Sequence, residues 1–222
     1  MGIFAFLNSK PSVQKLTNKL VKHIFTIIQT EKGVRVEDAI CVMATIVGER
    51  SIKIANEFSI DNHDFEPGSP IFSEKINEIL VGPKSVEKWN DLPTGCVFSQ
   101  IKLKLNSHFD SHIFPQLVNV FESFVKNVGE TEWGNLKLSV PEENKPFILP
   151  LQAGYETRAY VDEKINIVDD EYTLRVVINA MCSILIETKN AIESSIALAL
   201  TFEIIYGMSK TATMPNKKIK GL

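Results

Sequence analysis

The residues of this chain best suited to bind a metal lie in the stretch SHFDSHIFP, residues 107–115, which contains His108, Asp110 and His112. On a strand, residues two apart share a face, so these three side chains could converge on one cation. On a helix, the two histidines share a face because they are four residues apart, and Asp110 points away. Imidazole and carboxylate ligands suit zinc, iron or manganese. The candidates for a further ligand are Asp61, His63, Asp64 and Glu66.

A second interpretation of the same stretch needs no metal. Asp110 or Ser111 is a suitable N-cap residue, and Pro115 would then fall in the first turn of a helix, where a missing backbone N–H costs little. We favour this helix entrance and expect no cofactor. One divalent transition metal, held by the histidine and aspartate cluster, is the alternative.

The sequence lacks the motifs of the common enzyme classes, so no catalytic residue can be assigned from them. The sequence contains no Gly-x-Ser-x-Gly, no His-Glu-x-x-His, no Gly-x-Gly-x-x-Gly and no phosphate-binding Gly-x-x-x-x-Gly-Lys. Cys96 follows Gly95 and precedes an apolar run. It could be a reactive thiol only beside a histidine, and the sequence places none nearby. Whether the protein is an enzyme therefore stays open.

The segment YGMSKTATMP, residues 206–215, is polar and follows a very apolar stretch. The simpler interpretation is a helix exit whose Met208 and Met214 fold back on the core. In the functional interpretation, Ser209, Lys210 and Thr211 present hydrogen-bond donors to a partner or an anion.

Charge and composition restrict the class of protein. The chain has 222 residues, of which 44% are hydrophobic and 23% charged, and a formal net charge of −3. The last thirteen residues carry four lysines and no acid, so the rest of the chain sums to −7. An acidic body argues against nucleic-acid binding, which needs clustered positive charge.

The three cysteines, Cys41, Cys96 and Cys182, are far apart and lie in apolar surroundings. This spacing fits neither a disulfide framework nor a cysteine zinc site, so we expect reduced core residues in a reducing compartment. The first residues lack the basic region of a signal peptide, and no run reaches the length of a membrane span. We expect a cytoplasmic protein without a membrane span.

Hydrophobic periodicity predicts a mainly helical chain. Apolar spacing and the residues typical of helix ends predict helices over residues 12–29, 73–80, 111–128 and 190–206. Two more are expected, one that starts after Val34–Arg35 and one capped by Asp169–Asp170. Gly48 would either break the second helix or let another backbone approach it. Residues 51–60, 97–105 and 135–140 fit a strand as well as a helix or loop.

Pro141, Pro146 and Pro150 predict an extended strap, because this proline density excludes a helix interior and a central strand. We expect Phe147 and its apolar neighbours to pack this strap against the body. The expected fold is a single, mainly α domain over residues 1–222, with seven or eight helices, the proline strap, a small β-element as an option, and a flexible basic tail from about residue 210. An α+β domain is the alternative, if all three ambiguous segments are strands.

The two C-terminal helices are apolar on more than one face, which indicates central burial or a subunit contact. We therefore expect a non-enzymatic interaction or scaffold protein that self-associates through these helices. A metal-dependent hydrolase using the His/Asp cluster is the alternative. A third hypothesis is a helical sensor that holds an apolar ligand between its helices.

Overall fold

The computed structural model describes residues 11–58, 65–83, 86–126 and 135–214. Within these ranges the chain forms eight α-helices and no sheet, so the predicted mainly α fold is confirmed. The α-helices are α1 (Val13–Ile28), α2 (Val36–Ala55), α3 (Glu74–Val81), α4 (Val97–Leu105), α5 (Leu117–Val125), α6 (Pro150–Lys164), α7 (Asp170–Thr188) and α8 (Ser194–Met208). Three short 3₁₀ helices are η1 (Trp89–Asp91), η2 (Ser111–Ile113) and η3 (Glu142–Asn144).

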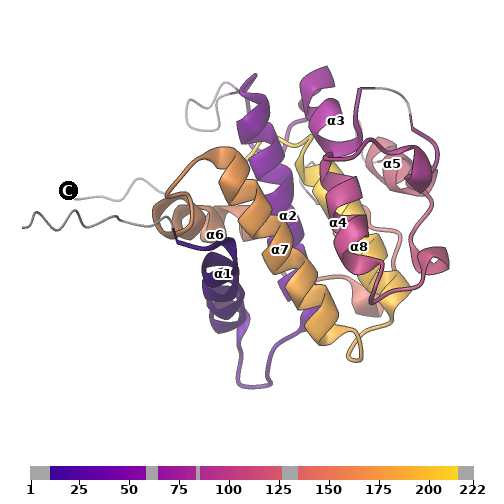
Figure 1. Ribbon diagram of the computed structural model, residues 1–222. Coiled ribbons are helices and arrows are strands. Elements are labelled where there is room, and N and C mark those ends of the chain that lie inside the picture. The colour runs from indigo at the N-terminus through magenta and orange to yellow at the C-terminus, as the bar shows by residue number, and fades with distance from the viewer. Residues whose placement is uncertain (1–10, 59–64, 84–85, 127–134, 215–222) are drawn as a thin grey trace, which may run out of the picture.

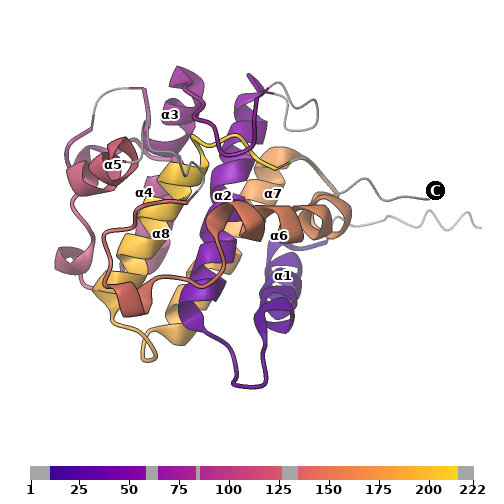
Figure 2. The same cartoon turned by 180° about the vertical axis from the view of Figure 1, so that it is seen from behind.

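Helix α2 is the centre of the molecule. It packs against α1, α3, α6, α7 and α8, and every residue from Asp38 to Ile52 is buried. In Figure 1, α1 and α6 lie on one side of α2 and α7, and α3, α4 and α5 lie on the other; Figure 2 shows the same arrangement from behind. The buried apolar side chains form one hydrophobic cluster to which all of these helices contribute.

Gly48 lies inside α2 and does not break it. A Cβ atom at this position would lie 2.9 Å from the carbonyl oxygen of Ile205 and 2.9 Å from the backbone nitrogen of Ser209. The absent side chain therefore lets the C-terminal end of α8 lie against α2. This is the close backbone approach that the sequence offers as the alternative to a helix break at Gly48.

Side-chain caps start three of the helices where the sequence predicts them. The Ser12 hydroxyl accepts a hydrogen bond from the backbone of Lys15 at 3.2 Å, and Ser73 caps α3 in the same way. The Asp169 carboxylate accepts from the backbone N–H of Tyr172 at 2.6 Å and caps α7. These caps satisfy backbone donors that have no partner within the helix.

The segments that fit both a strand and a helix contain no strand among their described residues. The second helix continues through residue 51 to Ala55, residues 97–105 form α4, and residues 135–140 form neither a helix nor a strand. Residues 59 and 60 lie outside the described residues. In α4, the buried residues Val97, Ile101 and Leu105 are four residues apart. The burial therefore follows the spacing of a helix and not the alternation of a strand.

The helix predicted over residues 111–128 starts later than expected. Residues Ser111–Ile113 form η2, and α5 begins only at Leu117 with Gln116 as its N-cap. Pro115 lies before the helix, not in its first turn. Asp110 occupies the N-cap position of η2, but its side chain makes no capping hydrogen bond.

The proline strap is shorter than predicted, and it is followed by helix α6, which the sequence pattern does not predict. Pro150 is the first residue of α6, where its fixed φ angle is favourable. Phe147 does not pack into the core, because it is 83% exposed and lies against the Arg35 guanidinium, 3.7 Å from the ring centroid. The strap is held instead through its backbone: the N–H groups of Phe147 and Ile148 both donate to Asp38 Oδ1.

The C-terminal part of the chain differs from the prediction in two ways. Helix α8 begins at Ser194 rather than at Asn190, and it extends through Gly207 to Met208. The basic tail does not start at residue 210, because Lys210, Thr211 and Ala212 are buried. Backbone hydrogen bonds with residues 68–71 hold this segment in place.

The apolar faces of α7 and α8 are covered by the chain itself. Helix α7 packs against α1, α2 and α4, and α8 packs against α2, α5 and α6. Every residue of α8 is buried or half-buried. Of the two explanations for these helices, the structure shows central burial.

Among the described residues, none of the helices has both the length and the apolar composition needed to cross a membrane.

Candidate functional site

A cleft of about 600 Å³ lies between α3 and α5, and α8 contributes to its lining. Aromatic and aliphatic side chains form much of its surface, among them Phe121 from α5 and Tyr206 from α8. Its remaining lining residues are Glu74, Asn77, Glu78, Val81, Gly82, Pro83, Val86, Glu87 and Val118. This volume falls within the range of roughly 300–1,000 Å³ that is typical of small-molecule sites.

The packing of Tyr206 makes it a rigid wall of the cleft. Its ring centroid lies 4.9 Å from that of Phe121 and 5.9 Å from that of Phe124, so α5 and α8 are joined through aromatic contacts. Burial raises the pKa of the Tyr206 hydroxyl above its ordinary value. The hydroxyl is therefore protonated at neutral pH and can donate a hydrogen bond.

Lys210 lies directly behind this wall. Its Nζ donates a hydrogen bond to the Asn77 side-chain oxygen and sits 4.7 Å from the centroid of the Tyr206 ring. Lys210 is only 4% exposed, and burial lowers the pKa of its amine from 10.5 to about 8. The amine contacts an amide oxygen and an aromatic ring, neither of which carries a compensating charge.

The charges around the cleft have both signs. Glu74, Glu78 and Glu87 are exposed carboxylates among its lining residues, while the Lys210 amine lies behind Asn77. The carboxylates among the lining residues repel an anion, and a protonated Lys210 behind Asn77 repels a cation. The arrangement favours a neutral ligand with an apolar body and a hydrogen-bond acceptor.

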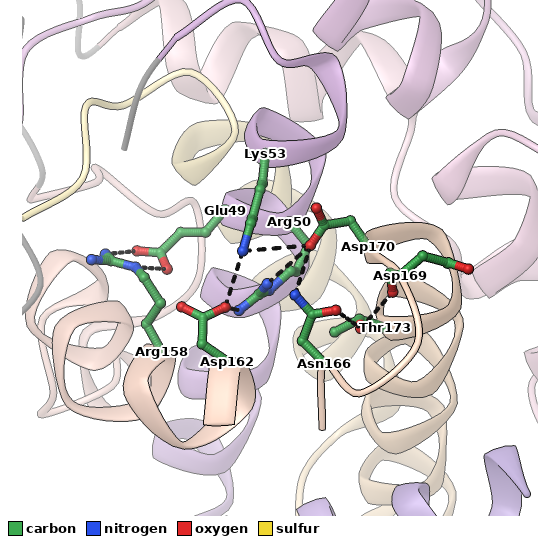
Figure 3. Close-up of polar contacts among 9 residues, drawn as sticks. All are labelled: Glu49, Arg50, Lys53, Arg158, Asp162, Asn166, Asp169, Asp170 and Thr173. Carbon is green, nitrogen blue, oxygen red and sulfur yellow. Dashed lines mark hydrogen bonds and ion pairs between the residues drawn. The ribbon is translucent and has the colours of Figure 1, made fainter. Parts of the chain in front are cut away.

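A second group of polar residues joins α2, α6 and α7 (Figure 3). Arg50 donates to Asp162 at 2.5 Å and lies 3.5 Å from Asp170, and Lys53 lies 3.2 and 3.5 Å from the same two carboxylates. Asn166 donates to Asp170 at 3.0 Å. Burial alone would raise the pKa of Asp162, but the charges of Arg50 and Lys53 outweigh it and hold that pKa below its ordinary value.

The same group contains the buried pair of Glu49 and Arg158 (Figure 3). Arg158 also donates from Nη1 to the backbone oxygen of Met214 at 2.6 Å, which ties the C-terminal segment to α6. A Cβ atom on Gly154 would lie 2.0 Å from Glu49 Oε1, so this glycine leaves room for the carboxylate. Because its acids and bases are paired with one another, we interpret this group as a clamp between helices.

The residues of the predicted metal site lie at the surface. His108 follows α4, Asp110 precedes η2 and His112 belongs to η2, and all three are exposed. His63 lies outside the described residues. Within the described part of the chain, no three His, Cys, Asp or Glu side chains come together in a group that could hold a metal ion. The two histidines and the aspartate stay sequence-based candidates only.

The three cysteines are free and buried. Burial raises the pKa of the Cys41 thiol far above its ordinary value and that of Cys182 to about 12, so neither is a thiolate at neutral pH. Cys96 lines a second cleft of about 580 Å³ between α3 and α4. The described residues that line this second cleft include no histidine, which a Cys–His pair would need.

The sequence pattern predicts neither Tyr206 nor Asn77 as a site residue, and it indicates Lys210 only as a donor to a partner or an anion. The available signal was the position of Lys210, two residues after the end of a very apolar helix. No protein-family model matches this chain, and neither a curated protein nor a solved structure matches it. The cleft between α3, α5 and α8 is therefore assigned from its geometry alone.

Proposed function

We propose that the protein binds a small, neutral, largely apolar ligand in the cleft between α3 and α5. The observation that carries this proposal is the combination of a cleft of about 600 Å³ with walls formed by Phe121, Tyr206 and valine side chains. Such a cleft buries apolar ligand surface, and its few polar groups orient the ligand. This function corresponds to the sequence-based hypothesis of an apolar ligand held between helices.

A matched pair of variants on α5 tests the proposal. Val118 lines the cleft and is 48% exposed, whereas Val125 lies on the same helix, is 64% exposed and does not line the cleft. Both sites accept lysine without filling the core. We expect Val118→Lys to obstruct the cleft and Val125→Lys to leave it open.

Benzyl alcohol is a suitable neutral probe, and its binding to the full chain can be followed by saturation-transfer NMR. The expected result is transfer to the probe with wild-type protein and with Val125→Lys, and at least a tenfold weaker affinity with Val118→Lys, a loss of about 1.4 kcal/mol. Absence of transfer with wild type, or equal affinity in the two variants, contradicts the proposal.

The other functions expected from the sequence stay predictions. Self-association through the C-terminal helices stays a prediction, and the apolar faces of α7 and α8 are covered by the chain itself. The hypothesis of a metal-dependent hydrolase also stays a prediction. It relies on the exposed residues around His108 and on His63. A cytoplasmic location likewise stays a prediction.

A further inference from the structure

We propose that the amine of Lys210 forms an imine with a small aldehyde or ketone bound in the cleft. This inference rests on the proposed function, because the cleft must first hold the carbonyl compound. It adds the chemical class of the ligand and a covalent step.

The position of the amine is the first argument. Lys210 Nζ contacts Asn77 by a hydrogen bond and Tyr206 across its ring, and both of these residues line the cleft. The amine therefore contacts two lining residues of the cleft, although Lys210 itself is not one of them. A ligand carbonyl that displaces the Asn77 amide as hydrogen-bond acceptor brings its carbon next to the nitrogen.

The backbone around the lysine is fixed, which is the second argument. The carbonyl oxygen of Lys210 accepts from the N–H of Ile71 at 2.8 Å, and its own N–H donates to Gly207 at 3.1 Å. Thr211, the next residue, forms a β-bridge with Pro70. The side chain thus extends from a rigid segment toward α3 and is not a mobile surface lysine.

The protonation state of the amine supports the step. A lysine amine is a nucleophile only when it is neutral, and burial in apolar surroundings favours the neutral form. With its pKa near 8, Lys210 has a substantial neutral fraction at neutral pH. Exposed lysines, with pKa values near 10.4, have a neutral fraction smaller by about two orders of magnitude.

The reaction is balanced without any oxidant or reductant. The nitrogen lone pair attacks the carbonyl carbon, and the C=O π electrons move to oxygen. A proton passes from nitrogen to that oxygen and gives a carbinolamine. Protonation of the hydroxyl group and loss of water then form the C=N bond. Tyr206 lines the cleft, and its hydroxyl is protonated at neutral pH.

The surroundings restrict the carbonyl compound. The carboxylates of Glu74, Glu78 and Glu87, which line the cleft, disfavour keto acids and phosphorylated aldehydes. Phe121 and the valine side chains favour a ring or an alkyl chain as the body of the ligand. The expected class is therefore a neutral aldehyde or ketone with an apolar substituent.

Reductive trapping of the full-length protein tests the inference. Benzaldehyde is added near pH 7 with sodium cyanoborohydride, which reduces the imine to a stable benzylamine, and peptide mapping by mass spectrometry locates the adduct. We expect labelling at Lys210 to be at least tenfold faster than at Lys75, an exposed lysine of α3, in view of the larger neutral fraction. The anionic 4-formylbenzoate is expected to label Lys210 more slowly than benzaldehyde does.

Val118→Lys and Val125→Lys show whether the amine is reached through the cleft. Labelling of Lys210 should fall at least tenfold in the first variant and stay unchanged in the second. Equal labelling of Lys210 and Lys75, or equal labelling in both variants, overturns the imine step. If benzyl alcohol still binds in that case, the ligand-binding function stands without the covalent step; if it does not bind, both proposals fail.

Discussion

Glu49 and Arg158 form a buried ion pair joined by two hydrogen bonds. Arg158 Nη2 donates to Glu49 Oε1 at 2.7 Å, and Arg158 Nε donates to Oε2 at 2.9 Å. Glu49 is 2% exposed and Arg158 is 3% exposed, so water screens neither charge. The pair joins the centre of α2 to α6, a helix with few apolar residues of its own to hold it in place.

Removal of one member of this pair should strongly destabilise the protein. Glu49→Gln leaves the Arg158 charge buried without its carboxylate, and such losses cost about 3–5 kcal/mol. We expect this decrease in the free energy of unfolding, measured by urea denaturation. Glu163→Gln, which removes a half-exposed carboxylate of α6 that pairs with Lys164, is the control and should change little.

The double variant Glu49→Leu/Arg158→Met separates two contributions to the free energy of unfolding. One is the lost attraction between Glu49 and Arg158, and the other is the cost of leaving one of their charges buried without the other. Because no charge is left buried, we expect the double variant to be more stable than Arg158→Met alone. If Glu49→Gln is no less stable than the Glu163→Gln control, the pair does not hold α6 as we infer.

Gly48→Ala tests the close approach of α2 and α8. In an unconstrained helix, alanine would be more stable than glycine by about 1 kcal/mol. Here the new methyl group would lie 2.9 Å from the backbone atoms of Ile205 and Ser209, which cannot move without displacing α8. We expect a net loss of about 1–3 kcal/mol in urea denaturation. A stabilising effect would mean that the two backbones are farther apart.

Local signals in the sequence predict much of this fold. Ser12, Ser73 and Asp169 mark the starts of α1, α3 and α7 because a capping side chain acts on backbone groups only a few residues away. Helix α6 lacks such a signal. It has a weak apolar face, and its position depends on pairs such as Glu49–Arg158, whose partners are 109 residues apart.

The site could not be predicted for the same reason. Asn77 and Lys210 are 133 residues apart in the chain, and only the tertiary fold places α3 beside the segment that follows α8. The spacing of His108 and His112, by contrast, is local and can be recognised in the sequence. A local pattern identifies residues that can share a face, but it does not show what packs opposite that face.

Stability should depend on pH through Lys210. Its folded-state pKa of about 8 lies below the ordinary 10.5, so between these values the unfolded chain binds more protons than the folded protein. The contribution of Lys210 to the free energy of unfolding is therefore most favourable above about pH 10.5, where the amine is neutral in both states. This contribution is lost as the pH falls through about 8.

We expect the free energy of unfolding to rise by on the order of 2 kcal/mol between about pH 7 and about pH 9.5 through this group. Urea denaturation at several pH values measures it, and the window ends below the titration of Tyr206. Lys210→Met should remove this rise, whereas Lys75→Met, at an exposed position of α3, should retain it. An unchanged pH profile in Lys210→Met would show that the lysine is not desolvated.

Asp38 should hold the strap that precedes α6. Its Oδ1 accepts from the N–H groups of Phe147 at 2.7 Å and Ile148 at 3.2 Å, while the Phe147 ring itself stays exposed. Asp38→Ala removes the acceptor of both donors, and we expect it to cost about 1–3 kcal/mol. Hydrogen exchange followed by mass spectrometry should show faster exchange in a peptide that covers residues 145–149. Glu163→Ala, at an exposed position of α6 that pairs with Lys164, is the control and should leave that peptide unchanged. Equal exchange in both variants would mean that side-chain packing, not Asp38, positions the strap.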